Sequence, residues 1–474
     1  MKRIIYIVIS ALLLTGASCK KDLGKLPENA KVDGNTILDQ RTAEIALNGV
    51  YYRFANVSTN NNNTTSWFEH EVVPGMFAGY LGYGYGPDPA EDNDYANSGY
   101  SDIYWSSSYA LINAANGIIK GVTALEDKQF TGNRKKEILS EARFMRAYAH
   151  FKLLSYYGEW YDLSSPHGAL LRNEFVTLAN IAKKRSTVNE SYAFILQDLD
   201  DAIANAAADR PDYYATRWTA MALKMRVMMS HGQPADYTTA INLADSIILN
   251  SHYALEPKAQ DIFYTKGLGS KEVILGIQPQ QNQETYYYNL SSQYWPGASA
   301  LYVAKQALKD LLKNDPRESW LTGSANPSTD GTYYFLKYIA EGTKATPLSE
   351  TAYAFRLTEV YLLKAEAIVR SGGSLAAARD ILKNIMGHAG VADFTAVDNA
   401  VSQDQLLKQI YFEIAKNLVG EDGQEWMALL RLPFATVQQL RPSITDKIRY
   451  ILPIPHAEFV SNPAIGDQNT GYQK

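Results

Sequence analysis

Residues 141–157 read EARFMRAYAHFKLLSYY, and this stretch decides the kind of fold that the chain adopts. Phe144, Tyr148 and Phe151 recur at helical spacing on one face, while Met145 and Ala149 fall on another. A helix that is apolar on more than one face is buried on most sides, so the pattern predicts a central helix of a larger helical protein. The glycine directly after the stretch predicts its end.

Further helices are predicted on both sides of this segment. They span Tyr104–Val122, Tyr192–Ala208, Arg217–Met229, Tyr237–Leu249, Phe355–Arg370, Leu375–Met386, Gln405–Leu418 and Gln424–Leu430. Short loops such as residues 371–374 imply antiparallel neighbours. Large-to-small spacings such as Ala147 with Phe151 indicate tetratricopeptide-like helix pairs with a degenerate repeat. We therefore expect a mainly α fold, built on a tetratricopeptide-like helix-hairpin scaffold with long irregular loops and a few short strands.

Two long segments do not fit the helical scaffold. Residues 56–103 are rich in Asn, Gly, Tyr and Asp, and residues 256–350 mix loops with strand-like pieces at Glu272–Gln278 and Thr332–Tyr338. Irregular segments of this length are usually functional or disordered, and their aromatic content favours order. The first contains GYLGYGYG at residues 79–86, which lacks the Lys-Ser/Thr of a phosphate loop and predicts a flexible aromatic loop.

The N-terminus has the layout of a secretory signal. Lys2 and Arg3 precede an apolar run that is too short for a bilayer span, and small residues then lead to Cys19, the only cysteine. A single cysteine at this boundary is typical of the acylated first residue of a bacterial lipoprotein. The alternative is an incidental cysteine near an ordinary cleavage site. We expect residues 1–18 to be a signal peptide, residues 19–33 a lipid-anchored polar tether, and residues 34–474 one domain.

The composition favours a protein that binds ligands through aromatic side chains and argues against nucleic acid as the ligand. The 474 residues include 33 tyrosines and 7 tryptophans, whose flat apolar faces and polar edges suit binding surfaces. The formal net charge is −5, and no Lys/Arg cluster forms a basic stripe, so we expect no nucleic-acid ligand.

Four short segments carry a resemblance to a known family. They are EARFMRAYAHFKLLSYYG at 141–158, DPR at 315–317 with KY at 337–338, RLTEVYLLKAEA at 356–367, and LPIP, NP and NTGY between 452 and 472. In this order they resemble the SusD/RagB family of nutrient-binding outer-membrane lipoproteins. Two segments depart from the family pattern: GQEWMALLR at 423–431 lacks the aromatic-Asp pair of GHRWFDLRR, and EWYDL at 159–163 replaces a proline-bearing continuation.

The resemblance implies a role without catalysis. Such proteins capture an oligosaccharide, or in some members a peptide, and deliver it to a SusC-like TonB-dependent transporter on which they sit as a lid. It also implies a lipid anchor in the bacterial outer membrane, facing the cell surface, and no cofactor. A lid with little ligand affinity of its own stays open as an alternative. The chain contains no HExxH, CxxC or GxSxG motif.

Three groups of polar residues contain side chains of the kinds found at metal or catalytic sites. Glu69-His70-Glu71 offers metal-ligand types, but adjacent residues of a strand point to opposite faces, which favours structural carboxylates near a histidine. Asp198, Asp200 and Asp201 are acids of the kind that glycosidases use, yet their spacing indicates the solvated face of a helix. The acids of residues 88–94 match no EF-hand loop, and calcium is left open there; no metal site is predicted.

The candidate ligand-binding residues are the aromatics of the two irregular segments. Sugar rings present apolar C–H faces that pack flat on aromatic rings, while polar side chains bind the hydroxyls. Packing within the segments, or contact with the transporter, is the alternative role for each. The candidates are Trp67, Tyr80, Tyr83, Tyr85, Tyr286, Tyr287, Tyr288, Tyr294, Trp295 and Trp320.

Overall fold

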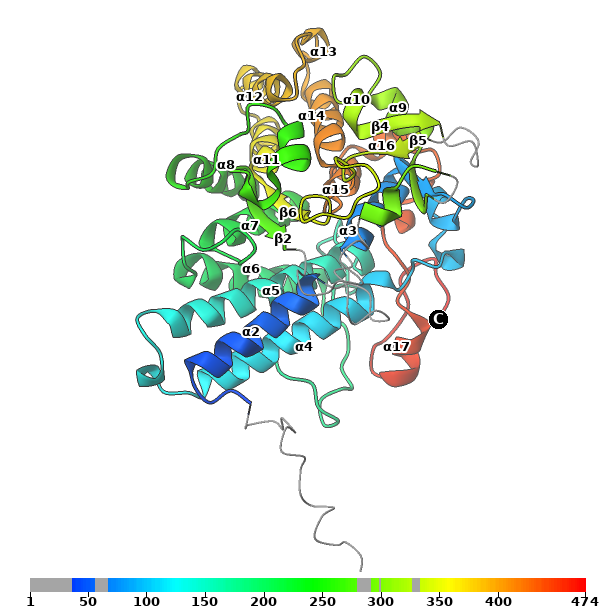
Figure 1. The fold of residues 1–474 in the computed structure, drawn as a ribbon. Coiled ribbons are helices and arrows are strands. Elements are labelled where there is room, and N and C mark those ends of the chain that lie inside the picture. The colour runs from blue at the N-terminus through cyan, green and yellow to red at the C-terminus, as the bar shows by residue number, and fades with distance from the viewer. Residues whose placement is uncertain (1–35, 56–66, 279–290, 298–299, 326–332) are drawn as a thin grey trace, which may run out of the picture.

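The computed structural model describes residues 36–55, 67–278, 291–297, 300–325 and 333–474. Most of its elements are helices, which confirms the expected mainly α class (Figure 1). The helices are α2 (Gln40–Ala55), α3 (Phe68–Ala78), α4 (Ile103–Thr123), α5 (Arg134–Tyr157), α6 (Val188–Asn205), α7 (Arg217–His231), α8 (Pro234–Asn250), α9 (Gln306–Leu311), α10 (Glu318–Leu321), α11 (Leu357–Arg370), α12 (Leu375–His388), α13 (Thr395–Asp398), α14 (Gln403–Leu418), α15 (Gln424–Leu430), α16 (Phe434–Leu440) and α17 (His456–Ser461). The strands are β1 (Leu81–Tyr83), β2 (Val273–Ile277), β3 (Tyr302–Ala304), β4 (Thr322–Ala325), β5 (Tyr333–Phe335) and β6 (Ala352–Arg356).

The predicted helix pairs form a continuous stack. Helix α4 packs along α5, α5 along α6, α6 along α7 and α7 along α8, and the stack continues through α11 to α12 and α14. Figure 1 shows this progression from the cyan helices at the bottom to the yellow and orange ones at the top, with α2 beside α4 and α5. The loop at residues 371–374 joins the neighbours α11 and α12, as its length predicts.

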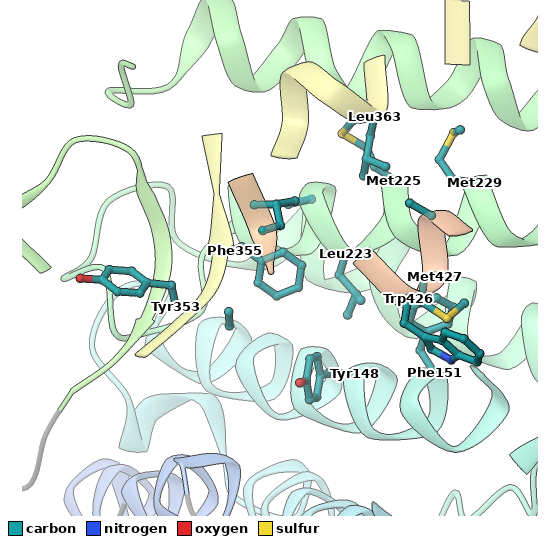
Figure 2. Close-up of a cluster of buried hydrophobic side chains, with 14 of the residues drawn as sticks. Tyr148, Phe151, Leu223, Met225, Met229, Tyr353, Phe355, Leu363, Trp426 and Met427 are labelled. Atoms are coloured by element: carbon teal, nitrogen blue, oxygen red, sulfur yellow. The ribbon is translucent and has the colours of Figure 1, made fainter. Parts of the chain in front are cut away.

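Helix α5 contains the stretch that opened the sequence and lies at the centre of the core. It ends at Tyr157, before Gly158, and nearly every side chain from Ser140 onward is buried. Figure 2 shows Tyr148 and Phe151 of this helix in one cluster with Phe355 of β6 and Trp426 of α15. The helix is therefore covered on most sides, which explains why its apolar residues do not follow a single stripe.

The acids of α6 require a correction. Asp198 was expected on a solvated face, but it is buried, and its carboxylate accepts hydrogen bonds from Arg146 Nε at 2.8 Å and Nη2 at 2.7 Å. Asp201 pairs with Arg143 at 2.6 Å, and only Asp200 is well exposed. The face that carries Asp198 and Asp201 packs on α5, where arginines of the EARFMRA segment neutralise both, whereas Asp200 pairs with Lys224 of α7.

The first irregular segment contains a helix that the sequence analysis did not predict. Helix α3 includes Glu69, His70 and Glu71, so the strand interpretation of these residues was wrong. Its residues are buried almost throughout, so no amphipathic stripe marks it. Pro74 and Gly75 also lie inside it, and both residue types ordinarily predict a helix end.

Both predicted strands are confirmed within the second irregular segment, as β2 and β5. Strand β2 pairs antiparallel with β6, so residues 352–356 are a strand, and α11 begins at Leu357 rather than at the expected Phe355. The other four strands form one sheet in the order β1-β3-β5-β4. In that sheet β1 and β3 run antiparallel with Leu81 opposite Ala304 and Tyr83 opposite Tyr302.

Candidate ligand-binding site

Residues 81–83 of the GYLGYGYG stretch form β1, the edge strand of the four-stranded sheet, so the predicted loop is in part a strand. Gly79 ends α3 with a φ of +82°, a conformation that favours glycine. Leu81–Tyr83 then pairs with β3, and the Gly84 amide donates to the Leu301 carbonyl at 2.7 Å. A Cβ atom at Gly84 would lie 1.9 Å from the Ala300 carbonyl oxygen. Gly84 therefore allows two chain segments to approach closely. Tyr83 lies on the paired strand, and Tyr85 follows it in a turn.

Four tyrosines gather at this sheet edge, and we call them the tyrosine surface: Tyr83, Tyr85, Tyr100 and Tyr302. The Tyr83 ring centroid lies 5.7 Å from that of Tyr85 and 6.1 Å from that of Tyr302. The Tyr100 and Tyr302 hydroxyls are 3.3 Å apart. Tyr85 is 59% exposed and Tyr83 is half-buried, so ring surface is open to a ligand.

The hydroxyls of this surface are hydrogen-bonding groups at neutral pH. Burial raises the pKa of Tyr100 to about 12, and burial together with the neighbouring Tyr100 raises the pKa of Tyr302 further. Both phenols therefore keep their protons, and one of them donates to the other. Tyr302 is buried, so the half-buried Tyr100 is the hydroxyl that can also bond to a ligand.

An acidic side chain holds the tyrosine surface in place. Glu91 is buried, its Oε1 accepts from the Tyr83 amide at 2.8 Å, and its Oε2 lies 2.9 Å from Lys305 Nζ. Asp88 Oδ1 accepts from the Ala90 amide and from the Ser98 hydroxyl, both at 2.8 Å. These acids of the 88–94 stretch thus stabilise the loop behind the strand.

The described ranges contain no group of three or more His, Cys, Asp or Glu side chains that could hold a metal ion. The described residues therefore provide no such set of ligands for calcium at residues 88–94, which the sequence left open.

Two of the predicted aromatics are core side chains with no exposed surface. Trp67 is 0% exposed and stacks on the His70 ring with the centroids 4.2 Å apart. Tyr294 is also 0% exposed, and its hydroxyl donates to Glu71 Oε2 at 2.7 Å. Neither offers a ring face to a ligand in this structure, so ligand contact is not proposed for them.

Two more predicted aromatics are nearly buried. The Tyr80 hydroxyl lies 2.6 Å from that of Tyr411, and burial raises the pKa of Tyr80 to about 12. Trp320 stacks on Phe263 with the centroids 5.9 Å apart. Their aromatic character thus serves packing, because composition alone does not distinguish a buried ring from an exposed one.

Of the remaining predicted residues, the structure describes one, and the others lie outside the described ranges. Trp295 is half-buried and follows a short turn at Ser291–Tyr294. Tyr286, Tyr287, Tyr288 and the expected lipid-attachment residue Cys19 lie outside the described residues.

A second aromatic concavity was missed by the sequence analysis. We call it the tyrosine pocket: it has a volume of about 260 Å³ and is lined by Tyr51, Tyr52, Tyr213 and Tyr214, together with residues of β2. Tyr51 and Tyr214 meet edge to face at 4.9 Å, and Tyr213 lies 4.8 Å from Tyr214. The two adjacent Tyr-Tyr pairs in the sequence were the available signal.

One member of the tyrosine pocket is fixed in place. The Tyr51 hydroxyl donates to Glu141 Oε2 at 2.6 Å and accepts from the Ala215 amide at 2.8 Å. Burial, together with the Glu141 carboxylate, raises the pKa of Tyr51 well above its ordinary value. Tyr213 and Tyr214 are half-exposed and stand at its mouth.

Comparison with known proteins identifies the family of this fold. Residues 21–229 match a family model described as "Starch-binding associating with outer membrane", and residues 316–472 match the model of the SusD family. A SusD-like protein of Bacteroides ovatus is 21% identical over 434 residues, which cover 80% of this chain and 74% of that protein.

Solved structures share the fold. A SusD superfamily protein from Bacteroides thetaiotaomicron has a TM-score of 0.74 at 22% identity and covers 91% of this chain and 100% of its own. A putative sugar-binding protein from Bacteroides vulgatus has a TM-score of 0.72 at 20% identity, and the match covers 92% of this chain and 100% of that protein's chain.

The helix-pair stack is thus the fold of SusD superfamily structures. The chain belongs to the SusD/RagB family. Within the described residues, no helix has the length and hydrophobicity needed to span a bilayer.

Proposed function

We propose that this protein captures an oligosaccharide at the bacterial cell surface and delivers it to a SusC-like TonB-dependent transporter. The observation that carries the proposal is the tyrosine surface, where two rings with open faces are held by a buried acid and a paired strand. The starch-binding description of the matched family and the sugar-binding description of one structural neighbour support the same ligand class.

The geometry suits recognition of a sugar without chemical change. Apolar faces of a pyranose ring pack on Tyr83 and Tyr85, while the protonated hydroxyl of Tyr100, which Tyr302 holds in place, binds ring oxygens and hydroxyls. The tyrosine pocket offers further ring surface for a longer chain. The protein acts by binding alone in this proposal, and turnover of a bound oligosaccharide by the pure protein would contradict it.

Alanine at Tyr83 or Tyr85 is expected to weaken oligosaccharide binding by about 1–3 kcal/mol, because each change removes a stacking face. The measurement is affinity electrophoresis across a glycan panel, followed by titration calorimetry with the glycan that binds. Tyr361→Ala, a half-buried tyrosine on α11, is the matched control and is expected to leave affinity unchanged.

Two outcomes would count against this site. Unchanged affinity in both variants would show that the ligand binds somewhere other than the tyrosine surface. Absence of binding to every glycan, combined with loss of uptake when the gene is deleted, would favour a transporter lid with little affinity of its own.

The membrane attachment in this proposal depends on Cys19. Cys19→Ala is expected to shift the protein from the membrane fraction to the soluble fraction, because a diacylated cysteine is the only anchor proposed. Fractionation and metabolic labelling with palmitate are the measurements, with Ser18→Ala as the neighbouring control. Palmitate incorporation into Cys19→Ala would reject the lipoprotein interpretation.

A further inference from the structure

A third concavity lies on a part of the molecule that shares no residue with the tyrosine surface or the tyrosine pocket. It has a volume of about 480 Å³, within the roughly 300–1,000 Å³ range of small-molecule sites. The ends of α7, α11, α14 and α15 converge on it, together with the segment after α5 and the turn at Lys447–Tyr450. We call it the helix-end cavity.

Aromatic rings from three segments line one side of the helix-end cavity. Trp160 and Tyr450 lie nearly parallel, with the planes 20° apart and the centroids at 6.4 Å. Tyr161 meets both edge to face, at 5.7 Å from Trp160 and 5.5 Å from Tyr450, and is half-exposed. Phe434 completes the group at 6.3 Å from Tyr450. Trp160 and Tyr450 are themselves buried, so Tyr161 and Phe434 provide the exposed ring surface of this aromatic wall.

Three buried polar atoms of residues that line the helix-end cavity have no hydrogen-bond partner among the described residues. They are Trp160 Nε1, Ser230 Oγ and the Tyr450 hydroxyl. A buried polar group without a partner costs stability, so native structures ordinarily satisfy it through protein, water or ligand. The three atoms have almost no exposed surface, so a ligand reaches them only if their side chains move. Their grouping in residues of one concavity is the feature that points to a ligand there.

A neighbouring concavity of about 400 Å³ shows the contrasting case. Its tryptophan, Trp105, donates to Glu458 Oε2 at 3.2 Å, and its tyrosine, Tyr109, donates to the Leu170 carbonyl at 3.0 Å. The chain thus satisfies these aromatic polar groups where it builds a cavity wall for structural purposes, and it does not do so in the helix-end cavity.

The rim of the helix-end cavity presents both donors and acceptors. Lys447 and Asp404 are exposed and carry opposite charges, and Lys447 Nζ lies 5.6 Å from the centre of the Tyr161 ring. Arg370 and Arg431 share Glu366, whose one negative charge balances one of their two positive charges. A rim of mixed sign fits hydroxyl groups, each of which donates and accepts, better than it fits an ion.

We propose that the helix-end cavity binds a single neutral hexose ring, as a second saccharide site separate from the tyrosine surface. The ring packs on Tyr161 and Phe434, the partly exposed rings of the wall. Its hydroxyls take the bonds that Trp160, Ser230 and Tyr450 leave open, once these buried side chains turn toward the cavity. A protein that holds one glycan at two sites gains retention through the high effective concentration of the second contact.

The test uses the purified mature chain with D-glucose, D-galactose and D-mannose as probes at millimolar concentrations. At least one hexose is expected to bind saturably and to change the tryptophan fluorescence. Tyr450→Phe and Trp160→Phe keep a ring but remove one donor each, so both are expected to weaken that binding about three- to tenfold. Tyr450→Phe is also expected to raise the Tm of the free protein, because it removes an unpartnered buried hydroxyl.

Two matched controls separate this site from others. Tyr109→Phe removes a satisfied hydroxyl from the neighbouring concavity, so it is expected to lower the Tm and leave hexose binding unchanged. Tyr85→Ala is expected to leave hexose binding unchanged, whatever it does to oligosaccharide binding. The proposal is overturned if no hexose binds, if Tyr450→Phe lowers the Tm, or if binding is lost in Tyr85→Ala and retained in Tyr450→Phe.

Discussion

Asp422→Asn is expected to lower the free energy of unfolding by about 3–5 kcal/mol, the range for removing one partner of a buried ion pair. The Asp422 side chain is 0% exposed and lies 2.7 Å from Lys152 Nζ and 2.6 Å from Arg226 Nη1. The Tyr148 hydroxyl donates to it at 2.9 Å. Burial opposes ionisation of this carboxyl, but the cations outweigh burial and hold its pKa well below the usual range. Since Arg226 also binds Glu359, the substitution leaves Lys152 as the uncompensated buried charge.

A double variant distinguishes the charge from the packing. Asp422→Asn with Lys152→Met removes both members of the pair and is expected to recover a large part of the loss, since an apolar side chain needs no partner. Urea denaturation followed by circular dichroism gives the free energies. The control is Asp467→Asn, whose ion pair with Lys474 is well exposed and is expected to change stability by less than about 0.5 kcal/mol. A loss below about 1 kcal/mol for Asp422→Asn would contradict this account.

The residues that carried the family resemblance are those that build such buried ion pairs, which explains why the fold was predictable. Arg317 of DPR binds both Asp315 and Glu413, and Lys337 of the KY pair binds Glu421. A buried charge demands one particular partner, so these residue types recur at fixed spacings that a reader of the sequence can find. The motifs report on the scaffold and contain no information about the ligand.

The candidate site was less predictable because it depends on two physical properties that local sequence patterns do not determine. Burial is the first: Trp67 and Tyr83 lie in the same irregular segment, yet one is a core side chain and the other faces outward. The second is strand register, which places Tyr302 opposite Tyr83 although they are more than two hundred residues apart. The predicted Tyr83 and Tyr85 lie at the surface, whereas Tyr100 and Tyr302 needed the structure to be found.

Glu425→Gln is expected to stabilise the protein by about 3 kcal/mol at pH 7, with the gain depending on pH. Glu425 is 0% exposed, and burial raises the pKa of its carboxyl to about 8, from 4.5 in the unfolded chain. Between these values the folded chain holds a proton that the unfolded chain has lost, so the free energy of unfolding falls as pH rises. Each pH unit in this window contributes about 1.4 kcal/mol. Glutamine keeps the shape and an oxygen for the Gly420 amide, which lies 3.4 Å from Oε1, but it has no proton to hold.

The two proteins should therefore have the same stability at pH 4 and diverge steadily up to pH 8. Groups that titrate in both proteins contribute equally to both stabilities, so they cancel when one is subtracted from the other. Urea midpoints of the variant and the parent at matched pH values therefore give the contribution of Glu425 alone. Glu126→Gln, at a side chain that is 68% exposed, is the control and should follow the parent at every pH. If the difference in stability between Glu425→Gln and the parent stays constant over this range, Glu425 is already ionised in the folded protein. That state would require a cation or water to reach the buried Oε2, which has no partner among the described residues.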